Sequence, residues 1–353
     1  MFWLMFRTII YLGVFIAIWQ IGQIYVASEL QKGLHETSDH AIFVDQKILE
    51  DTSKTEMQNG SLTYPFSTIA AGLDAAKTQD ISTLIIAEGN YEETLKLPEN
   101  IILYGDGLVT INQDSNDTAH VITTNNSNKL INLHISGGNH AVVIPHNTSV
   151  TFLNTTLANA NDFGVKMEKK ERPKPPVGTT EPITYEVFDI PNDEIMNMPL
   201  VRFSNVTVTK NGNQGMYLFD GRVEIVNSHI VENGEEGIDL HPHMHATITN
   251  TDASRNGESG LETEVYDNTV IIENSKFTDN IKNGIALITS HGIGDISIIN
   301  NEIINNQKFG LRCAIHKTKP KKPRPFFSSI ITETDNQIED NVKANISTEC
   351  LTF

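Results

Sequence analysis

The sequence predicts an all-β protein, a single-stranded right-handed parallel β-helix with coils of 22–26 residues and a short N-terminal capping helix. Glycines that open an apolar couplet recur at spacings of 22, 23, 24 and 26 residues, at Gly215, Gly237, Gly260, Gly284 and Gly310. A register of asparagines repeats with the same period. Short segments between these residues alternate apolar and polar side chains, and no segment after residue 80 sustains a helical period.

The capping helix is expected around residues 64–76. Ser67 is the expected N-cap, and Ile69, Leu73 and Ala76 would form the apolar face of the helix. An open stack of coils needs such a cap, because its terminal strand would otherwise present an unpaired edge.

The recurring asparagines are expected at the corners of the coils, because asparagine tolerates the left-handed backbone conformation. Stacked along the axis, their side chains are expected to hydrogen-bond in a ladder. Such a ladder accounts for the glycosylation sequons at Asn154 and Asn205 better than attached sugars do. The register consists of Asn132, Asn154, Asn205, Asn227, Asn250, Asn274 and Asn300.

The chain divides into four regions along its length. These are a signal anchor or signal peptide at 1–27, a linker or loose strand at 28–60, the β-helix at 61–345, and a C-terminal tail at 346–353. Insertion loops are expected at 166–199 and 314–327. A closing disulfide between Cys313 and Cys350 is one of two open alternatives, the other being free thiols.

The N-terminal region predicts export. Residues 8–26 carry no ionised side chain, and a helix of this length spans the hydrocarbon core of a bilayer. An uncleaved transmembrane anchor is favoured over a signal peptide, because Tyr25 and the nearby glutamines make a poor cleavage site. Either interpretation exports the body of the protein to the periplasm or the cell surface, and the anchor makes the membrane a partner through the N-terminal segment.

The charge balance limits the class of partner. The chain carries 26 Lys and Arg against 44 Asp and Glu, a formal net charge of −18, which argues against a nucleic-acid partner. Yet 11 of the 26 basic residues lie in or beside the two insertions. Basic loops at the ends of an acidic and aromatic groove would suit an acidic polysaccharide. No protein partner is inferred.

Stacked coils place equivalent positions about 4.8 Å apart, so the repeat predicts spatial neighbours. Counted from the opening glycine, positions +1 and +3 are apolar and point inward, so positions +2, +4 and +6 share an outer face. The +2 column contains Lys166, Tyr217, Asp239, Glu262, Ala286 and Arg312. The +4 column contains Glu168, Phe219, His241, Glu264, Ile288 and Ala314, and position +6 adds His243 and Tyr266.

The middle of this face is a candidate site. Asp239, His241, Glu262 and Glu264 form a two-by-two patch there, flanked by aromatic side chains. Carboxylates at this spacing repel one another, which raises at least one pKa and lowers stability. A column selected for folding alone would more commonly hold Thr, Asn or Ser. A solvated charged face is the alternative interpretation.

The capping segment and the Asn- and Gly-rich coils over 62–345 resemble the pectate-lyase-like β-helix proteins. Within them, three successive coils resemble the catalytic coils of mannuronan C5-epimerases. They are Glu236-Gly-Ile-Asp-Leu-His-Pro-His243, Asn256-Gly-Glu-Ser-Gly-Leu-Glu-Thr-Glu264 and Asn283-Gly-Ile-Ala-Leu-Ile-Thr-Ser290. The resemblance assigns that family's Asp to Asp239, its His to His241 and its next-coil acid to Glu264. The family's Tyr falls on Glu236.

The resemblance implies an exported carbohydrate-active protein that acts on a uronate-containing polysaccharide by C5 epimerisation or β-elimination. Such chemistry needs a base, an acid and neutralisation of the substrate carboxylate. His241 is the expected base, and Tyr217, or alternatively Tyr266, replaces the missing phenol. Asp239 and Glu264 complete the expected catalytic set. The expected substrate-binding residues are Glu262, His243, Tyr266, Phe219 and Arg312.

Two other function classes stay open. One is a non-catalytic, membrane-tethered protein that binds polysaccharide or builds a surface structure, which would tolerate loss of His241. The other is metal binding by His241, His243 and His245, alternating on one face beside Asp239 and Glu262. No metal ligand is assigned, and the cofactor is left open, with calcium as the one considered.

Overall fold

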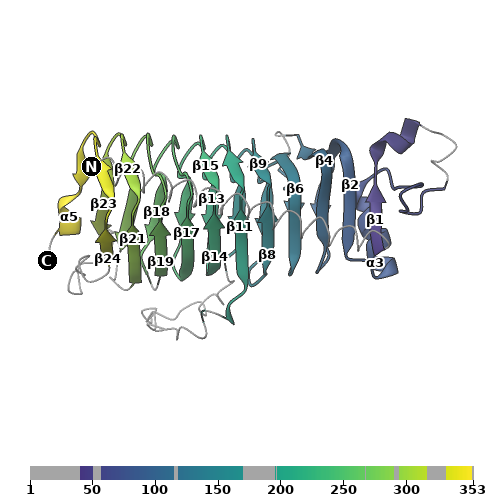
Figure 1. The fold of residues 1–353 in the computed structure, drawn as a ribbon, viewed down its shortest axis with the longest axis horizontal. Helices are drawn as coiled ribbons and strands as arrows, with labels where there is room; N and C mark the ends of the chain where they lie inside the picture. The colour runs from purple at the N-terminus through teal and green to yellow at the C-terminus, as the bar shows by residue number, and fades with distance from the viewer. Residues whose placement is uncertain are drawn as a thin grey trace, which may run out of the picture.

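The computed structural model describes residues 40–50, 57–114, 118–169, 195, 197–266, 268–289, 294–315 and 331–351. These residues form an elongated stack of coils whose strands run parallel to their partners (Figure 1). Parallel strands joined by successive crossovers wind in the right-handed sense. The predicted right-handed parallel β-helix is confirmed.

Within the described residues, the strands belong to two long sheets and one short sheet. The 14-stranded sheet contains β1 (Ala41–Val44), β2 (Thr83–Glu92), β4 (Ile102–Gln113), β6 (Asn128–Gly137), β8 (Val150–Leu153), β9 (Thr156–Ala158), β11 (Leu200–Ser204), β12 (Thr207–Thr209), β14 (Gly221–Val226), β15 (His229–Val231), β17 (Met244–Thr249), β19 (Asn268–Glu273), β21 (Gly294–Ile299) and β24 (Ile331–Thr334). The 10-stranded sheet contains β3 (Leu95–Lys96), β5 (Ile122–Thr123), β7 (Val142–Ile144), β10 (Val165–Met167), β13 (Met216–Leu218), β16 (Ile238–Leu240), β18 (Leu261–Glu264), β20 (Ile285–Thr289), β23 (Phe309–Ile315) and β26 (Ala344–Ile346). The short sheet pairs β22 (Glu302–Ile304) with β25 (Gln337–Glu339), and the helices are η2 (Gln46–Glu50), α3 (Ile69–Gln79) and α5 (Thr348–Leu351).

Strand pairing follows the predicted period. In the ten-stranded sheet, Ile238 pairs with Met216 of the preceding coil and Leu261 of the following coil. The side chains at +1 and +3 point into the core, where Ile238 and Leu240 are fully buried. Burial of this apolar column supplies the main favourable free energy of the stack. Because side chains alternate along a strand, the +2 column faces outward.

The seven predicted corner asparagines all adopt the left-handed backbone conformation, with φ between 50° and 55°. Their side chains also form the predicted ladder. The Nδ2 atom of Asn205 donates to Oδ1 of Asn154 at 2.7 Å, and that of Asn300 donates to Oδ1 of Asn274 at 2.6 Å. At Asn154 and Asn205, the sequon amides are therefore ladder partners.

A second asparagine column runs through the interior, and the sequence analysis did not identify it. In each successive pair, Nδ2 of one residue donates to Oδ1 of the next at 2.9–3.2 Å. The same Oδ1 atoms accept hydrogen bonds from backbone N–H groups of the preceding coil. Every member is buried: Asn211, Asn233, Asn256, Asn280, Asn306 and Asn341.

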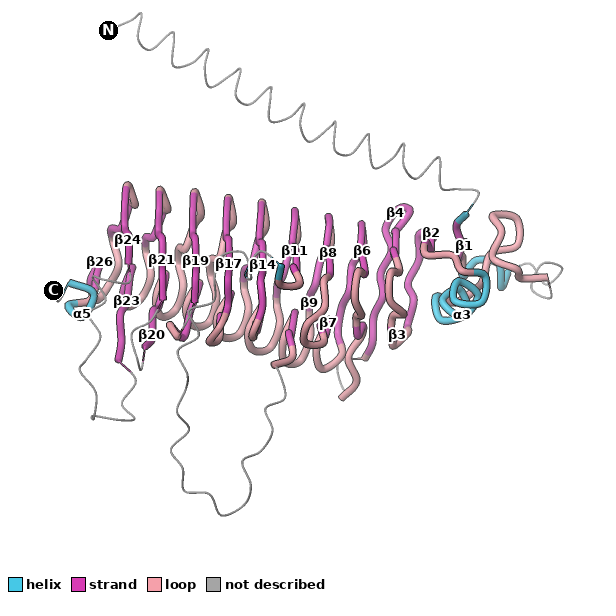
Figure 2. Tube along the Cα trace, turned by 90° about the horizontal axis from the view of Figure 1, so that it is seen from below, coloured by secondary structure: helices cyan, strands magenta, loops and turns pink. Residues whose placement is uncertain are grey.

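The N-terminal end of the stack is closed by α3, as predicted (Figure 2). Ile69, Leu73 and Ala76 form its buried face. The N-cap is Thr68 and not Ser67, because the Thr68 hydroxyl accepts the hydrogen bond from Ala71 N at 3.2 Å.

A strand lies inside the segment 28–60 that was expected to be a linker or loose strand. This strand, β1, pairs in parallel with β2, so it belongs to the first coil. Helix α3 packs closely on it: a Cβ atom added at Gly72 would lie 2.8 Å from Cγ2 of Val44.

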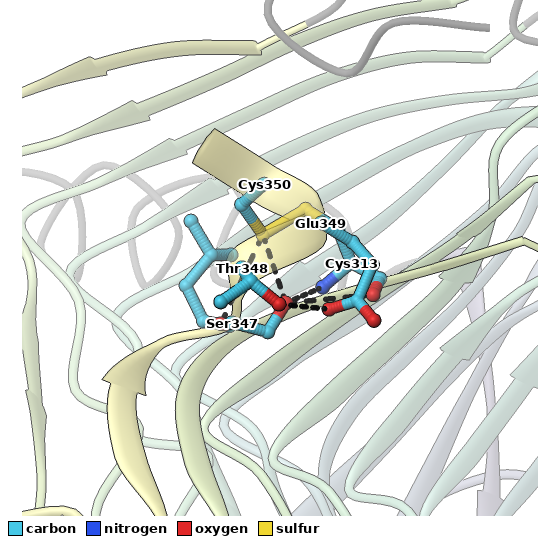
Figure 3. Close-up of a disulfide and its surroundings, with 6 residues drawn as sticks. Cys313, Ser347, Thr348, Glu349 and Cys350 are labelled. Atoms are coloured by element: carbon cyan, nitrogen blue, oxygen red, sulfur yellow. Dashed lines mark hydrogen bonds between the residues drawn. A yellow bond between two sulfur atoms is a disulfide. The ribbon is translucent and has the colours of Figure 1, made fainter. Parts of the chain in front are cut away.

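The C-terminal end is closed by a disulfide, which confirms the bonded alternative. Cys313 of β23 is joined to Cys350 of α5, 37 residues later (Figure 3). Between them, Ser347 accepts a hydrogen bond from Cys313 N through its hydroxyl at 2.9 Å. The expected tail at 346–353 therefore begins as part of the last coil and continues into α5.

Some expectations concern residues outside the described ranges. The anchor or signal peptide at 1–27 lies there, as do nearly all of the insertions at 166–199 and 314–327 with most of their basic side chains. Among the helices that the structure describes, none is long and apolar enough to cross a bilayer.

We expect Asn256→Ala to lower the free energy of unfolding by about 3–5 kcal/mol, because it leaves several buried hydrogen-bonding groups of neighbouring coils without partners. Its Nδ2 donates to both Ile230 O and Asn280 Oδ1. Asn250→Ala in the exposed ladder is the matched control and should cost about 1 kcal/mol. Urea unfolding followed by circular dichroism measures both. Equal losses would contradict a special role for the interior column.

Replacing Cys313 and Cys350 together by Ala should lower stability by about 4 kcal/mol, the chain-entropy value for a loop of 37 residues. Thermal unfolding with and without reductant measures the effect. The reductant should lower the midpoint of the wild type and leave that of the double variant unchanged. A wild-type unfolding midpoint that stays the same after complete reduction of the disulfide would contradict the stabilising role of the bond.

Candidate functional site

The structure confirms the predicted +2 column on the outer face of the ten-stranded sheet. Tyr217 pairs with Asp239, Asp239 with Glu262, and Glu262 with Ala286. The same register continues to Lys166 before Tyr217 and to Arg312 after Ala286. These side chains occupy successive strands β10, β13, β16, β18, β20 and β23, of which β13, β18 and β23 are labelled in Figure 1.

Asp239 and His241 form a hydrogen-bonded pair. Nε2 of His241 lies 3.1 Å from Oδ2 of Asp239, and both side chains are largely but not fully buried. An ionised carboxylate only accepts hydrogen bonds, so Nε2 is the protonated nitrogen of this ring. Nδ1 then carries the lone pair when the ring is neutral, which makes it the atom able to take a proton.

Two aromatic rings hold the imidazole of His241 in place. Phe219 stacks on it with ring centroids 3.9 Å apart and an interplanar angle of 17°. Tyr217 meets it edge-on at 4.6 Å and 76°. These contacts restrict the rotation of the imidazole, so its orientation is set before any ligand arrives.

Tyr217 is a neutral phenol at neutral pH. Burial raises its pKa above 10.0, and the nearby charges of Asp239 and Asp162 raise it further. Its ring also stacks on Phe163 with centroids 4.6 Å apart. The column therefore places a phenolic proton donor beside the imidazole.

Glu262 is the carboxyl group whose titration changes most among the predicted site residues. Burial raises its pKa from 4.5 to about 7, the charge of Asp239 in the neighbouring strand adds to the shift, and Arg312 opposes it. A substantial fraction of Glu262 is therefore protonated at neutral pH. The expected repulsion between stacked carboxylates is present at this pair.

The remaining predicted residues flank this centre. Glu264 ends β18, two residues beyond Glu262 on the same face, and pairs with Ile288 of the next strand. His243 meets Tyr266 edge-on at 5.2 Å, and His243 N donates to Tyr266 O at 3.0 Å. Tyr266 is only 8% exposed, so it offers little surface to a ligand and Tyr217 is the better-placed phenol.

The metal-site alternative does not fit the arrangement. His245 is a buried residue of β17 and belongs to the 14-stranded sheet, so the three histidines do not share one face. Within the described ranges, no group of three or more His, Cys, Asp or Glu side chains is arranged to hold a metal ion.

An acidic network that the repeat pattern does not predict lies behind the site. Glu236 is 5% exposed, and its pKa is raised to about 9 by burial, by a hydrogen bond with Glu258 and by the charge of Glu262. Lys282 forms an ion pair with Glu258 and balances its charge. Nε2 of Gln214 donates to Glu236 at 3.2 Å. Glu236 is therefore a neutral acid at the position where the resemblance places a tyrosine.

A signal for this network exists in the repeat. Glu236 directly precedes the opening glycine of its coil, and the equivalent positions of other coils hold His140, Phe163 and Gln214. This −1 column is buried at His140 and Glu236. A charged residue at a buried position is expected to have a shifted pKa. The alternation of apolar and polar residues in the strands, however, does not reveal that these positions are buried.

Comparison with known proteins agrees with the fold. The family model described as "Right handed beta helix region" matches residues 195–349. A cell surface glycoprotein of Methanothermus fervidus is 26% identical over 105 residues, which are 30% of this chain and 18% of that protein. This chain thus matches less than a fifth of the length of that relative.

Several solved structures match this chain over most of their length, with low TM-scores. The A-module of mannuronan C-5 epimerase AlgE4 from Azotobacter vinelandii superposes with a TM-score of 0.44 and 13% identity over 78% of this chain and 91% of that module. An alginate lyase from Paenibacillus sp. str. FPU-7 gives a TM-score of 0.48 and 10% identity over 79% of this chain and 97% of the lyase. Likenesses of this degree concern the fold alone.

The pKa of Glu262 predicts a pH dependence of stability. A carboxyl group whose folded pKa is raised favours the folded state while protonated, so its contribution is lost as pH rises from 4.5 through about 7. The Glu262→Gln variant lacks this titration. Its free energy of unfolding minus that of the wild type should therefore increase as pH rises from 4.5 to about 7. Urea midpoints at both ends of the window measure the difference. A constant difference would contradict the raised pKa.

Proposed function

We propose that this right-handed β-helix protein acts on a uronate-containing polysaccharide at C5 of the sugar ring. The observation that carries the proposal is the Asp239–His241 pair, held by Phe219 and lying beside the phenol of Tyr217. A base, an acid and a group that neutralises the substrate carboxylate are the requirements of proton abstraction next to a carboxylate. The outer face of the ten-stranded sheet carries all three kinds of group.

In the proposed mechanism, Nδ1 of His241 takes the C5 proton. Asp239 stabilises the imidazolium that results, through the hydrogen bond to Nε2. Charge that develops on the substrate carboxylate is met by the protonated form of Glu262, which donates a hydrogen bond, while Arg312, two strands further along, binds another carboxylate of the polymer. Tyr217 then gives its proton either to C5, which completes an epimerisation, or to the glycosidic oxygen that leaves C4, which completes a β-elimination.

Glu264 is proposed to complete the catalytic set, and Phe219 and His243 to border the substrate, with the buried Tyr266 packed against His243. Of these, Phe219 has the best-supported role, because its stacking fixes the imidazole of His241. Glu264 lies on the same face as Glu262 and adds a second carboxyl group near the substrate carboxylate. Calcium stays the one cofactor considered, with no ligand set assigned to it.

Export is part of the proposal. The Cys313–Cys350 bond supports an oxidising compartment, since structural disulfides persist outside the cytosol. The apolar run at 8–26 would then serve as the anchor in the membrane. The match to a cell surface glycoprotein is compatible with a periplasmic or surface location.

A second candidate is a non-catalytic protein that binds polysaccharide or builds a surface structure. It is favoured by Glu236, which stands where the resembling enzymes carry a tyrosine, and by the partial match to a cell surface glycoprotein. This candidate requires binding of uronate polymers without turnover. It also predicts that His241 is dispensable for binding.

The decisive assay incubates the protein with a panel of uronate polymers in deuterated water. Elimination appears as ultraviolet absorbance of an unsaturated product, and epimerisation as deuterium at C5 without chain shortening. His241→Ala should lower either signal about 10³-fold, and Tyr217→Phe about 10²-fold, the range of lost acid–base groups. His229→Ala on the exposed β15 strand is the matched control and should keep full activity.

Each outcome of this assay favours one candidate. Turnover that survives in folded His241→Ala would overturn the proposed mechanism. Polymer binding with neither signal, unchanged in His241→Ala, would replace it by the non-catalytic candidate.

A further inference from the structure

The +2 column continues beyond the reacting pair to a lysine. Lys166 of β10 pairs with Tyr217, so it lies two strand spacings, about 10 Å, from Asp239. In the other direction Arg312 lies two spacings beyond Glu262. The acids at the centre of the face are thus bracketed along the helix axis by a cation on each side, about 24 Å apart.

The ammonium group of Lys166 is held in position by a neutral partner. Its Nζ lies 3.3 Å from Nε2 of His140, which is 2% exposed. Burial, the charge of Lys166 and the neighbouring His120 lower the pKa of His140 to about 3. In the tautomer whose Nε2 carries the lone pair, the neutral imidazole accepts a hydrogen bond from the ammonium and leaves its charge in place. Within the described part of the chain, Lys166 forms no ion pair with a carboxylate.

A stack of rings supports this arrangement. His120, His140, Phe163 and Tyr217 follow one another at centroid distances of 4.6, 4.9 and 4.6 Å with interplanar angles of 20° or less. The Nζ atom of Lys166 lies 5.8 Å from the centre of the Phe163 ring. The two inner rings, His140 and Phe163, are each stacked against a ring on either side.

The inner rings of the stack therefore do not offer faces on which sugars could lie. The stack instead connects His140, which contacts Lys166, to Tyr217, whose ring contacts His241. Lys166 is half buried and contacts the ring stack that reaches Tyr217, the proposed acid. It is therefore suited to hold an anionic group at a set distance from the reaction centre.

We infer that Lys166, seated on His140, forms a distal carboxylate-binding subsite, and that a linear uronate chain lies along the helix axis from Lys166 to Arg312. The inference rests on the proposed function for the identity of the ligand. A pyranose unit in an extended chain is close in length to one strand spacing, so the five spacings from Lys166 to Arg312 accommodate about six sugar residues. The reacting sugar lies near the middle of that chain.

The test measures binding and turnover separately, with oligouronates of increasing length. The dissociation constant should fall with each added residue up to about six and then stay constant. Lys166→Ala should raise the dissociation constant of the hexamer about tenfold, the usual loss for one charge-assisted contact, and Lys166→Arg should restore most of it. The matched control is Lys129→Ala, an exposed lysine of β6 in the other sheet, which should bind as the wild type does.

The outcomes separate this inference from the proposed function. Weaker hexamer binding by Lys166→Ala without turnover in any variant would support the subsite and contradict the proposed chemistry. Turnover by the wild type, with equal dissociation and Michaelis constants for Lys166→Ala and Lys129→Ala, would overturn the subsite alone. Equal binding of a neutral glucan hexamer by the wild type would also overturn it, because the subsite recognises carboxylates. Circular dichroism of Lys166→Ala verifies that the fold is retained.

Discussion

The structure depends on one constraint, the exact-register stacking of each coil on the next, and the interior asparagine column enforces it. Each buried amide donates to the asparagine of the following coil and accepts from the backbone of the preceding one. A coil displaced by one residue would leave these groups unpaired in the core, where an unmade hydrogen bond is costly. Apolar burial makes the stack stable, and the asparagines select a single register.

The candidate site is a direct consequence of that register. Alternation along β16 turns Asp239 outward while Ile238 and Leu240 enter the core. The next coil then places Glu262 beside Asp239 at the strand spacing, which two ionised carboxylates oppose. This unfavourable placement is the reason why the pKa of Glu262 is near 7 and why Glu236 behind it is neutral. The acidic residues of the site thus lower the stability of their coils, and the asparagine and apolar columns offset that loss.

The same linear geometry suits an extended ligand. A solenoid repeats its outer positions at a constant spacing, so charges on one column can match a polymer with regularly spaced carboxylates. Lys166 and Arg312 lie on the column that carries Asp239 and Glu262, and the ring stack connects Lys166 to the imidazole of His241. The disulfide lies one residue from Arg312 and so secures the strand that presents it.

The sequence by itself determined the β-helix, its period, the corner asparagines and the members of the +2 column, because each of these follows from local backbone preference and a constant repeat length. Tertiary structure alone decided which groups are covered and by what. The burial that raises the pKa of Glu236 and Glu262, and the Cys313–Cys350 bond, depend on side chains from different coils meeting in space. The hydrogen bond between Asp239 and His241 and the choice of Thr68 over Ser67 as N-cap depend on local backbone geometry and on the rotamers that the folded chain selects. The repeat period predicts which residues are neighbours, but burial and side-chain rotamers determine how those neighbours change the pKa of a residue.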